Sequence, residues 1–331
     1  MKSRRSLVAA ALAKAGGVGV SGEQLGKLLG ISRVAIAKHI TALRDAGYEI
    51  SAVHGEGYRL NAMPQRLVPV EVERLLVEPL WTRIEGSPET ASTNDDCKAL
   101  ARAGALAGTV VMSGRQTGGK GRLGRTWVSP VGGVYLSALL TPSCGPADVA
   151  PLALACALGV ARGLESLGVD CQLKWPNDVL IGGRKVAGIL LEMSAEADRV
   201  DWVVVGCGIN VARAEGCFAE AAFLADVVEV PPSNVAAAVL DGIAVAYRDF
   251  EAGGFAAMRA AYESRHSLAA CEVVVRDGTG RIVAAGESVG VDDAGRLLVR
   301  DASGIVPVVA GEVTLRQPER NGDVDAPPAG V

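Results

Sequence analysis

A glycine-rich loop with four cations is the segment best suited to hold an anionic ligand. Residues 114–127 read GRQTGGKGRLGRTW, which fits the dinucleotide fingerprint and nearly fits a P-loop, with Gly121 in place of its final Ser or Thr. Both motifs require a helix directly after the glycines. Here Pro130, two more glycines and the strand-like run VYLSALL follow, so we expect neither nucleotide fold. The cations are Arg115, Lys120, Arg122 and Arg125.

The charge of this loop predicts its behaviour without a ligand. Like charges this close repel one another, so we expect a mobile loop that an anion neutralises and orders. Trp127 at its end is unusual for a simple linker. The alternative is a basic loop that only faces solvent.

A lysine at a predicted strand end is the second candidate for chemistry. Lys174 begins KWPND, where Asn177 and Asp178 should stabilise a rigid turn, and VLIGGRKVAGILLE then predicts a hairpin across Gly182 and Gly183. Burying a lysine among apolar neighbours is costly without an anion. The pattern therefore indicates a phosphate or carboxylate partner for Lys174.

Two further segments could contact a ligand, one through polar side chains and free backbone amides and the other through glycines. Ser92, Thr93 and Asn94 precede a predicted helix, with Asn94 or Asp95 as its cap, and could bind an uncharged polar group. Capping alone is the simpler explanation. The run GCGIN, residues 206–210, ends a predicted strand whose glycines allow close approach of a ligand or only close packing.

Composition restricts the classes of function. Residues 1–62 carry nine Lys/Arg and four Asp/Glu, so the remainder carries −9 in a chain of net charge −4. A basic head on an acidic body indicates that the head meets a polyanion, unless the basic face is merely solvated. Seven cysteines without a C-x-x-C, and three histidines, form no recognisable zinc motif and are typical of reduced thiols in a cytoplasmic protein.

Targeting segments are not expected. The N-terminus resembles a signal peptide, but Lys14 cuts its apolar run short and a domain begins inside it. The longest uncharged apolar run, residues 149–161, is too short to span a bilayer.

The head reads as a winged helix-turn-helix. A helix near residues 6–14 precedes two more, which Ser21 and Ser32 cap and which lie either side of Gly30 and Ile31. The segment YEISAVHGEGYRL predicts a hairpin, and residues 61–69 read as a linker to a separable module. A winged helix that binds protein is the alternative to DNA binding. The outer face that could reach bases and phosphates consists of Ser32, Arg33, Ala35, Lys38 and His39.

The rest of the chain divides into a mixed body and a β tail. The run from Ala147 to Leu167 predicts a core helix. Residues 270–316 alternate in short runs between turns, which predicts a small β-barrel, and residues 318–331 read as disordered. The whole is an α+β chain.

Six ordered motifs together resemble the bifunctional biotin protein ligases that double as biotin operon repressors. They are the winged helix, STN, QTGGKGRLGRTW, KWPND, RKVAGILLE and GCGIN, over nearly all of residues 1–317. The resemblance implies a winged helix-turn-helix at 1–63, a class II synthetase-like mixed-sheet catalytic domain at 66–268 and an SH3-like domain at 269–317. It also implies biotin–[acetyl-CoA-carboxylase] ligase activity, which is ATP-dependent and AMP-forming.

The resemblance assigns roles by motif. Lys174 and Arg122 would be catalytic. The residues implied to bind biotin are Ser92, Thr93, Asn94, Gln116, Lys120, Gly121, Arg122 and Lys174. Those implied to bind ATP or the adenylate are Arg122, Trp127, Lys174, Asn177, Asn210 and Arg316. Lys120 stands where the family often has arginine, and since lysine lacks the bidentate fork we expect looser retention of biotinyl-AMP.

The resemblance also implies ligands and partners. Biotin and ATP would be substrates with Mg²⁺, and no metal ligands are identified. The partners would be a biotin carboxyl-carrier domain, operator DNA and, with biotinyl-AMP bound, a second copy of the chain. A lipoate-type ligase and a ligand-sensing regulator without turnover are the alternatives.

Overall fold

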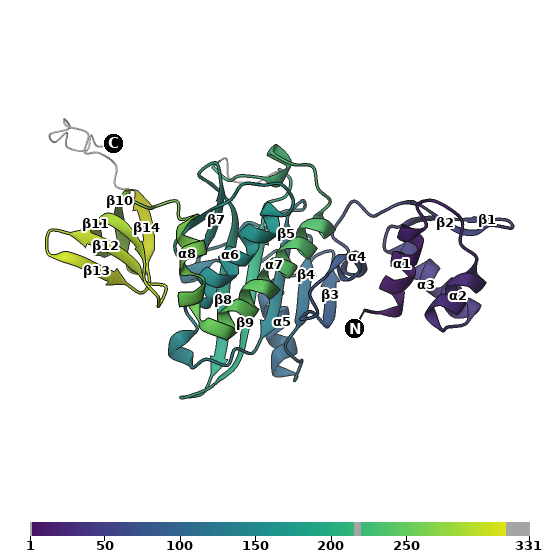
Figure 1. Cartoon of the computed structure of the whole chain (residues 1–331), viewed down its shortest axis with the longest axis horizontal. Helices are drawn as coiled ribbons and strands as arrows, with labels where there is room; N and C mark the ends of the chain where they lie inside the picture. Colours follow the sequence, from purple (N-terminus) through teal and green to yellow (C-terminus); the bar gives the residue numbers. More distant parts are fainter. Residues whose placement is uncertain (1, 215–219, 316–331) are drawn as a thin grey trace, which may run out of the picture.

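The molecule is elongated, with three bodies in chain order. The computed structural model describes residues 2–214 and 220–315. A small helical head lies at one end, a large mixed body in the middle and a small β body at the other end (Figure 1). The predicted contact of Arg316 and the predicted disorder of residues 318–331 lie outside the described residues.

The head has the predicted winged helix-turn-helix. Ser21 caps α2: its hydroxyl accepts the Gln24 backbone amide at 3.1 Å, and Gln24 Oε1 accepts the Ser21 backbone amide at 2.8 Å, which satisfies two free amides at the helix start. Gly30 ends this helix at φ +64°. The first helix begins at Arg4, two residues before the prediction. The elements are α1 (Arg4–Lys14), α2 (Gly22–Leu29), α3 (Arg33–Asp45), β1 (Glu49–Val53) and β2 (Gly57–Ala62).

A sheet of seven strands forms the middle body. Its order is β3-β4-β5-β9-β8-β7-β6. Only the β3–β4 pairing is parallel, so the sheet is mixed as expected. The strands are β3 (Arg83–Ser87), β4 (Thr109–Ser113), β5 (Val134–Leu140), β6 (Gln172–Lys174), β7 (Asp178–Ile181), β8 (Arg184–Ala195) and β9 (Val200–Ile209).

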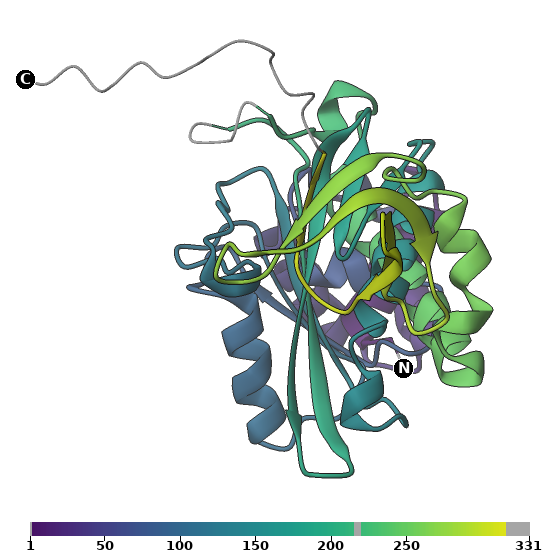
Figure 2. The same cartoon turned by 90° about the vertical axis from the view of Figure 1, so that its left-hand side faces the viewer.

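Helices cover the two faces of this sheet unequally. The long α6 (Leu152–Glu165) and α7 (Pro232–Gly253) pack on one face, while α5 (Thr93–Arg102) lies on the other (Figure 2). A Cβ at Gly159 of α6 would lie 2.7 Å from the Gly242 carbonyl oxygen of α7, so both glycines permit the close crossing. The predicted helix from Ala147 begins only at Leu152, because residues 146–148 form a separate 3₁₀ turn.

The C-terminal body is an antiparallel sheet in the order β13-β12-β11-β10-β14. Buried and exposed residues alternate along its strands, which places Val273, Val275 and Val299 in the core. Short α8 (Arg259–Glu263) leads into it. The strands are β10 (Glu272–Arg276), β11 (Ile282–Val291), β12 (Leu297–Asp301), β13 (Gly304–Val308) and β14 (Glu312–Leu315).

The head does not hang freely from its linker. The short helix α4 (Pro69–Leu75) follows the linker, and its buried Glu71 accepts the Tyr48 hydroxyl of the head at 2.5 Å. Arg74 donates two bonds to the same carboxylate, at 2.8 and 2.6 Å. Linker composition predicted a separable module, but a buried polar contact ties the module to the body.

Candidate active site

The start of α5 places three polar side chains inside the molecule. Ser92, Thr93 and Asn94 are between 2% and 5% exposed. Ser92 is the helix cap and accepts the Asp95 amide at 3.4 Å. The prediction that Asn94 or Asp95 is the cap is therefore wrong. Because Ser92 satisfies the helix end, the Asn94 side chain is free for other bonds.

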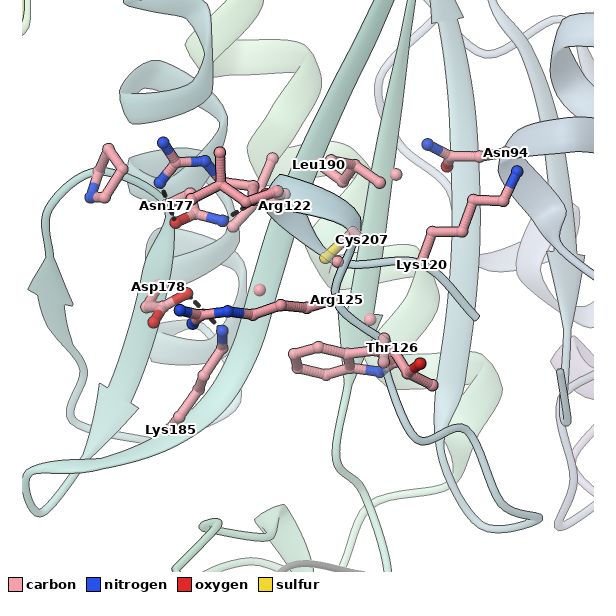
Figure 3. Close-up of a pocket in the computed structure, with 18 of the residues that line it drawn as sticks. Asn94, Lys120, Arg122, Arg125, Thr126, Asn177, Asp178, Lys185, Leu190 and Cys207 are labelled. Atoms are coloured by element: carbon pink, nitrogen blue, oxygen red, sulfur yellow. Dashed lines mark hydrogen bonds and ion pairs between the residues drawn. The ribbon is translucent and has the colours of Figure 1, made fainter. Parts of the chain in front are cut away.

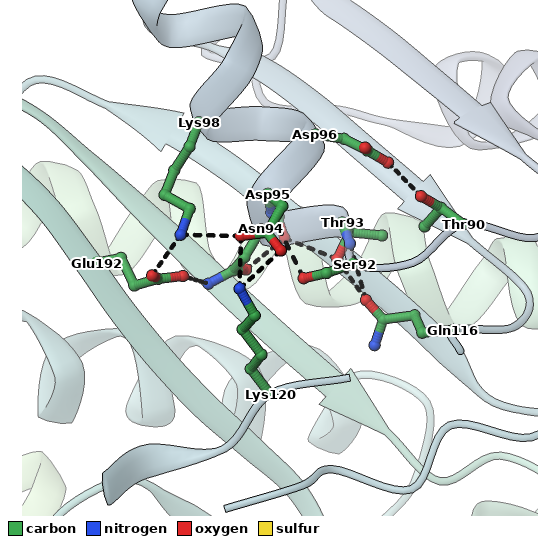
Figure 4. Close-up of polar contacts among 11 residues, drawn as sticks. Thr90, Ser92, Thr93, Asn94, Asp95, Asp96, Lys98, Gln116, Lys120 and Glu192 are labelled. Atoms are coloured by element: carbon green, nitrogen blue, oxygen red, sulfur yellow. Dashed lines mark hydrogen bonds and ion pairs between the residues drawn. The ribbon is translucent and has the colours of Figure 1, made fainter. Parts of the chain in front are cut away.

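Buried hydrogen bonds fix Thr93 and Asn94. The Ser137 hydroxyl of β5 lies 2.6 Å from Asn94 Oδ1 and 2.8 Å from Thr93 Oγ1. Gln116 Oε1 accepts the Thr93 amide at 2.8 Å (Figure 4). A Cβ at Gly206 would lie 2.1 Å from Asn94 Oδ1, so glycine in β9 makes room for the amide. These polar groups are held rigidly, as recognition of an uncharged ligand requires.

The glycine-rich loop contains a tight turn and no α-helix. Residues 122–124 form one 3₁₀ turn with Leu123 at φ +55°, and the Gly121 amide donates to the Arg125 carbonyl at 2.7 Å. The strand β5 follows the loop. This confirms that the loop is neither a P-loop nor a Rossmann turn, since neither helix is there.

Carboxylates neutralise three of the four loop cations. Arg115 pairs with Glu89 at 2.5 Å and Lys120 with Asp95 at 2.7 Å, while the two terminal guanidinium nitrogens of Arg125 contact Glu312 of β14. The expectation of simple mutual repulsion omitted these distant acids. Arg122 differs from the other cations. It is half-buried, it donates to Asn177 Oδ1 at 3.2 Å, and burial lowers its pKa (Figure 3).

Lys174 stands at the end of β6, as predicted. Its ammonium has no hydrogen bond or ion pair within the described residues, although the side chain is half-buried. Trp175 is buried, precedes a cis proline and donates to the Gly295 carbonyl of the C-terminal body at 3.0 Å. Lys174 is thus a positioned cation without an ion-pair partner in the described part of the chain, although its charge, after that of Arg125, helps to lower the pKa of Glu312.

Trp127 covers the sheet beside these cations. A Cβ at Gly208 would lie 2.5 Å from its Nε1, so the glycine lets the indole lie flat on β9. Lys185 Nζ lies 5.0 Å from the ring centroid and 2.6 Å from the carboxylate of Asp178. Trp127 Nε1 is buried without a partner within the described residues.

One cavity brings most of the predicted site residues together, on the sheet face that carries α5. The predicted residues that line it are Ser92, Thr93, Asn94, Gln116, Lys120, Gly121, Arg122, Trp127, Lys174 and Asn177. Asn210 is not among them, and its amide instead lies 3.4 Å from the Lys185 carbonyl. Sequence reasoning missed Lys185 and Glu312, although RKVAG contains Lys185. Nothing local marks Glu312, which lies far along the chain from its partner.

The cavity suits chemistry between two anions. Uncharged polar groups of Ser92, Thr93, Asn94 and Gln116 line it, and so do the cations Arg122 and Lys174. The lining carboxylates Asp178 and Glu312 are already paired, with Lys185 and Arg125. The thiol of Cys207, which lines the cavity, is not poised as a nucleophile, since burial raises its pKa to about 12. No group of three or more His, Cys, Asp or Glu that could hold a metal ion occurs within residues 2–214 and 220–315.

The predicted DNA face is divided between two sides of α3. Arg33 and Lys38 are exposed, while Ser32 uses its hydroxyl to cap the helix by accepting the Ala35 amide at 3.2 Å. His39 lines a groove between head and body with Pro69, and burial, with Arg5 nearby, lowers its pKa. His39 therefore faces the body side of the helix.

Three family models match the chain. Residues 4–59 match the HTH domain, residues 88–210 the Biotin/lipoate A/B protein ligase family and residues 272–316 the Biotin protein ligase C terminal domain. These ranges cover the head, the polar and cationic cavity motifs and the β body.

Curated relatives match the chain nearly end to end. Bifunctional ligase/repressor BirA of Bacillus subtilis (strain 168) is 34% identical over 314 residues, which is 91% of this chain and 95% of that protein. The chain belongs to the bifunctional biotin ligase/repressor family. The protein of the same name from Escherichia coli (strain K12) is 33% identical, over 91% of this chain and 94% of its own length.

Solved structures of biotin ligases share the fold. The biotin protein ligase from Aquifex aeolicus in complex with biotin and ATP superposes with a TM-score of 0.61 at 30% identity. The match covers 70% of this chain and 98% of that one. The resemblance expected from six motifs is confirmed. Among the described residues, no helix is long and apolar enough to cross a bilayer.

Proposed function

We propose that this chain joins biotin to AMP with ATP and transfers the biotin to a lysine of a biotin carboxyl-carrier domain. One observation carries the proposal. A single cavity is lined both by rigid uncharged polar groups at Thr93 and Asn94 and by the cations Arg122 and Lys174. The relative solved with biotin and ATP and the full-length BirA relatives support this choice of ligands.

In this proposal each side of the cavity binds one part of the adenylate. Ser92, Thr93, Asn94 and Gln116 hydrogen-bond the ureido group of biotin. Lys174, which forms no ion pair with any described residue, binds the biotin carboxylate and the α-phosphate. The repulsion between these two anions is thereby offset, and charge growing on the phosphorus in the transition state is stabilised.

The loop supplies the other cation and a cover. Arg122, held by Asn177, approaches the phosphate from the loop, and Trp127, Asn177 and Lys174 surround the adenylate. Lys120 and Gly121 close over biotin. Excluding water in this way protects the mixed anhydride until the amine of the carrier lysine attacks its carbonyl carbon, which forms an amide and releases AMP. Roles for Asn210 and Arg316 stay predictions.

We further propose that Mg²⁺ arrives on the ATP phosphates. The pocket carboxylates Asp178 and Glu312 are already paired, with Lys185 and Arg125, so they fit a metal cage poorly. The metal would supply charge neutralisation for departing pyrophosphate. ATP as substrate and the free thiols of the described residues agree with a cytoplasmic location.

A transfer assay tests the ligase proposal. The chain is incubated with ATP, a carrier domain and labelled biotin or lipoate, and Lys174→Ala serves as control. We expect biotin to be transferred and lipoate not. Transfer of lipoate alone would establish the alternative ligase, and transfer of neither label would leave a ligand-sensing regulator.

We also propose that the biotinyl-AMP form binds operator DNA as a homodimer and represses biotin genes. The exposed Arg33 and Lys38 on α3, the +5 charge of residues 1–62 and the BirA relatives support this role. Footprinting upstream of biotin genes, with biotin and ATP present, should show protection over two half-sites. Absence of protection at every protein concentration would remove the DNA role and favour a protein-binding head.

A further inference from the structure

Four charged side chains connect the ureido side of the cavity to the loop that covers it. Lys120 of the loop places its ammonium 2.7 Å from both oxygens of Asp95. Lys98, one turn further along α5, lies 3.0 Å from the same carboxylate. Its ammonium also lies 2.5 Å from Glu192 Oε1 of β8 (Figure 4).

The chain of contacts ends on a ligand-facing amide. Glu192 Oε2 accepts from Asn94 Nδ2 at 2.8 Å, while Asn94 Oδ1 accepts from Ser137. These two bonds settle which end of the amide faces which neighbour. One amide hydrogen of Asn94 is left for a ligand. Loss of the Glu192 charge would free the amide to flip.

Lys98 is the centre of this network. Its side chain is only 14% exposed, against 29% for Glu192 and 43% for Asp95, and it contacts both carboxylates. Burial alone would lower its pKa, but the bonds to Glu192 and Asp95 outweigh burial and raise it. The lysine is thus charged, and without it two nearby carboxylates would repel each other.

None of the three linking side chains borders the cavity in which the ligand would lie. Asp95, Lys98 and Glu192 are absent from the cavity lining, whereas Asn94 and Lys120 belong to it. Any effect of the three on biotin must therefore pass through Asn94 or Lys120. This distinguishes them from the binding residues of the proposed function.

We propose that Lys98 is a positioning residue of this ligase, which couples the orientation of Asn94 to the closed position of Lys120 on the loop. Through Glu192 it sets the affinity for biotin, and through Asp95 it sets how long biotinyl-AMP stays bound. The inference rests on the proposed ligase function. It also gives Lys120 a local partner in place of the bidentate contacts of an arginine.

The two arms of the network should differ in strength. Lys120 and Asp95 are 46% and 43% exposed, so solvent and salt screen their attraction, and such pairs contribute little. Asp95→Asn should speed the release of biotinyl-AMP about 3-fold, by the strength of exposed pairs. Glu192→Gln should raise KM for biotin about 10-fold, by the strength of bonds to charged groups.

The decisive variant is Lys98→Met, which keeps a long unbranched side chain and removes its positive charge. We expect about 10-fold higher KM for biotin, by the strength of the Glu192 arm. Release of biotinyl-AMP should be at most about 3-fold faster, because that effect passes through the exposed Asp95. KM for ATP and the adenylation kcat should stay within about 2-fold, because the reacting phosphate meets other residues. Lys98→Arg should restore both values, and Lys27→Met on the exposed head is the matched control.

The coupling between the two arms can be measured by a double-mutant cycle. A variant that is merely less stable would not change the result of that cycle. Asp95→Asn and Glu192→Gln should act non-additively when Lys98 is present and additively in Lys98→Met. Salt should speed release in wild type and have less effect in Asp95→Asn. Circular dichroism checks that each variant is folded. If Lys98→Met does not fold, the separate variants Asp95→Asn, Glu192→Gln and Lys98→Arg test the positioning role instead.

The possible outcomes distinguish failure of the positioning role of Lys98 from failure of the proposed ligase function. If wild type makes biotinyl-AMP while Lys98→Met binds and releases it like wild type, the positioning role is overturned. If the changes appear in Lys98→Arg as strongly as in Lys98→Met, the charge is not what matters and the inference also fails. If wild type makes no biotinyl-AMP, the proposed function itself fails.

Discussion

At the scale of single residues, the site depends on which polar groups have partners. Asn94 and Thr93 use their hydrogen bonds on Ser137, Gln116 and Glu192, so their orientation is set before a ligand arrives. Lys174 has no such partner within the described residues. One cavity therefore contains both polar groups whose orientation is already fixed and a cation without an ion-pair partner among the described residues. Each of these features can be tested by one substitution.

Lys174→Met should lower the rate of adenylation by about 10²–10³-fold, because loss of one preorganised charge at a reacting phosphate has that size. Biotin binding should fall less, since the ureido contacts remain. Rapid-quench measurement of biotinyl-AMP formation, beside equilibrium binding of biotin, checks this. Equal losses of both quantities would contradict a role in the transition state.

Gly206→Ala should impair biotin binding by moving Asn94. The added Cβ would lie 2.1 Å from Asn94 Oδ1, so the amide must shift and its bond to Ser137 must weaken. We expect at least about 10-fold weaker biotin binding and a stability loss of about 1–3 kcal/mol. Gly145→Ala, whose Cβ has its nearest neighbour at 3.9 Å, is the matched control for calorimetry. Unchanged binding in the Gly206 variant would show that Asn94 does not meet biotin.

At the scale of elements, the segment between α8 and β10 supports the strand that carries Lys174. The Leu173 amide donates to the Arg265 carbonyl at 2.8 Å, and the Ser267 amide donates to Leu173 at 2.8 Å. His266 between them is 7% exposed, and its ring nitrogens have no partner within the described residues. The strand β6 is thus held by a segment that contains a buried, neutral histidine.

This histidine should make stability depend on pH. Burial, opposed by Glu263, lowers the pKa of His266 from 6.5 to about 4. Below pH 6.5 His266 is therefore protonated in the unfolded chain but stays neutral in the folded chain. The free energy of unfolding thus falls as the pH drops from 6.5 towards 4. The full effect is about 3 kcal/mol. Urea unfolding of wild type and His266→Gln should show a shallower pH slope in the variant, and equal slopes would refute the assignment.

Local pattern predicted the elements but not their long-range partners. Turn residues and alternation gave the hairpin at Gly182–Gly183, the strand after Trp127 and the strand end at Lys174, because those signals are local. The start of α6 was missed since the preceding turn competes with the helix. Glu312 meets Arg125 across 187 residues of sequence, and only the tertiary fold brings such a pair together.

At the scale of the whole molecule, the three bodies are joined by polar contacts. Ser3 of the head donates from its hydroxyl to Glu73 at 2.6 Å, and Tyr48 and Arg74 share the buried Glu71. At the other end, Trp175 and Arg125 contact the C-terminal body. A signal from the cavity to the DNA-binding head must cross the first of these junctions.

Tyr48→Phe should loosen the head without unfolding it. It removes a buried bond to a charged group, worth about 1.5–3 kcal/mol. We expect lower thermal stability of the head and faster proteolysis at residues 63–68. Tyr58→Phe, in the same head and without a described hydroxyl bond, is the control. Similar proteolysis of both variants would mean that the Glu71 contact does not hold the head.

The C-terminal body is also one wall of the cavity, because Gly311, Glu312 and Val313 line it. A ligand bound there touches two bodies at once and adds contact area between them. Binding should therefore merge their melting into a more cooperative transition, visible as a narrower calorimetric peak. The bound adenylate would thus act as a removable cross-link between the two bodies. The rigidity of the molecule would then depend on how much biotin and ATP are available.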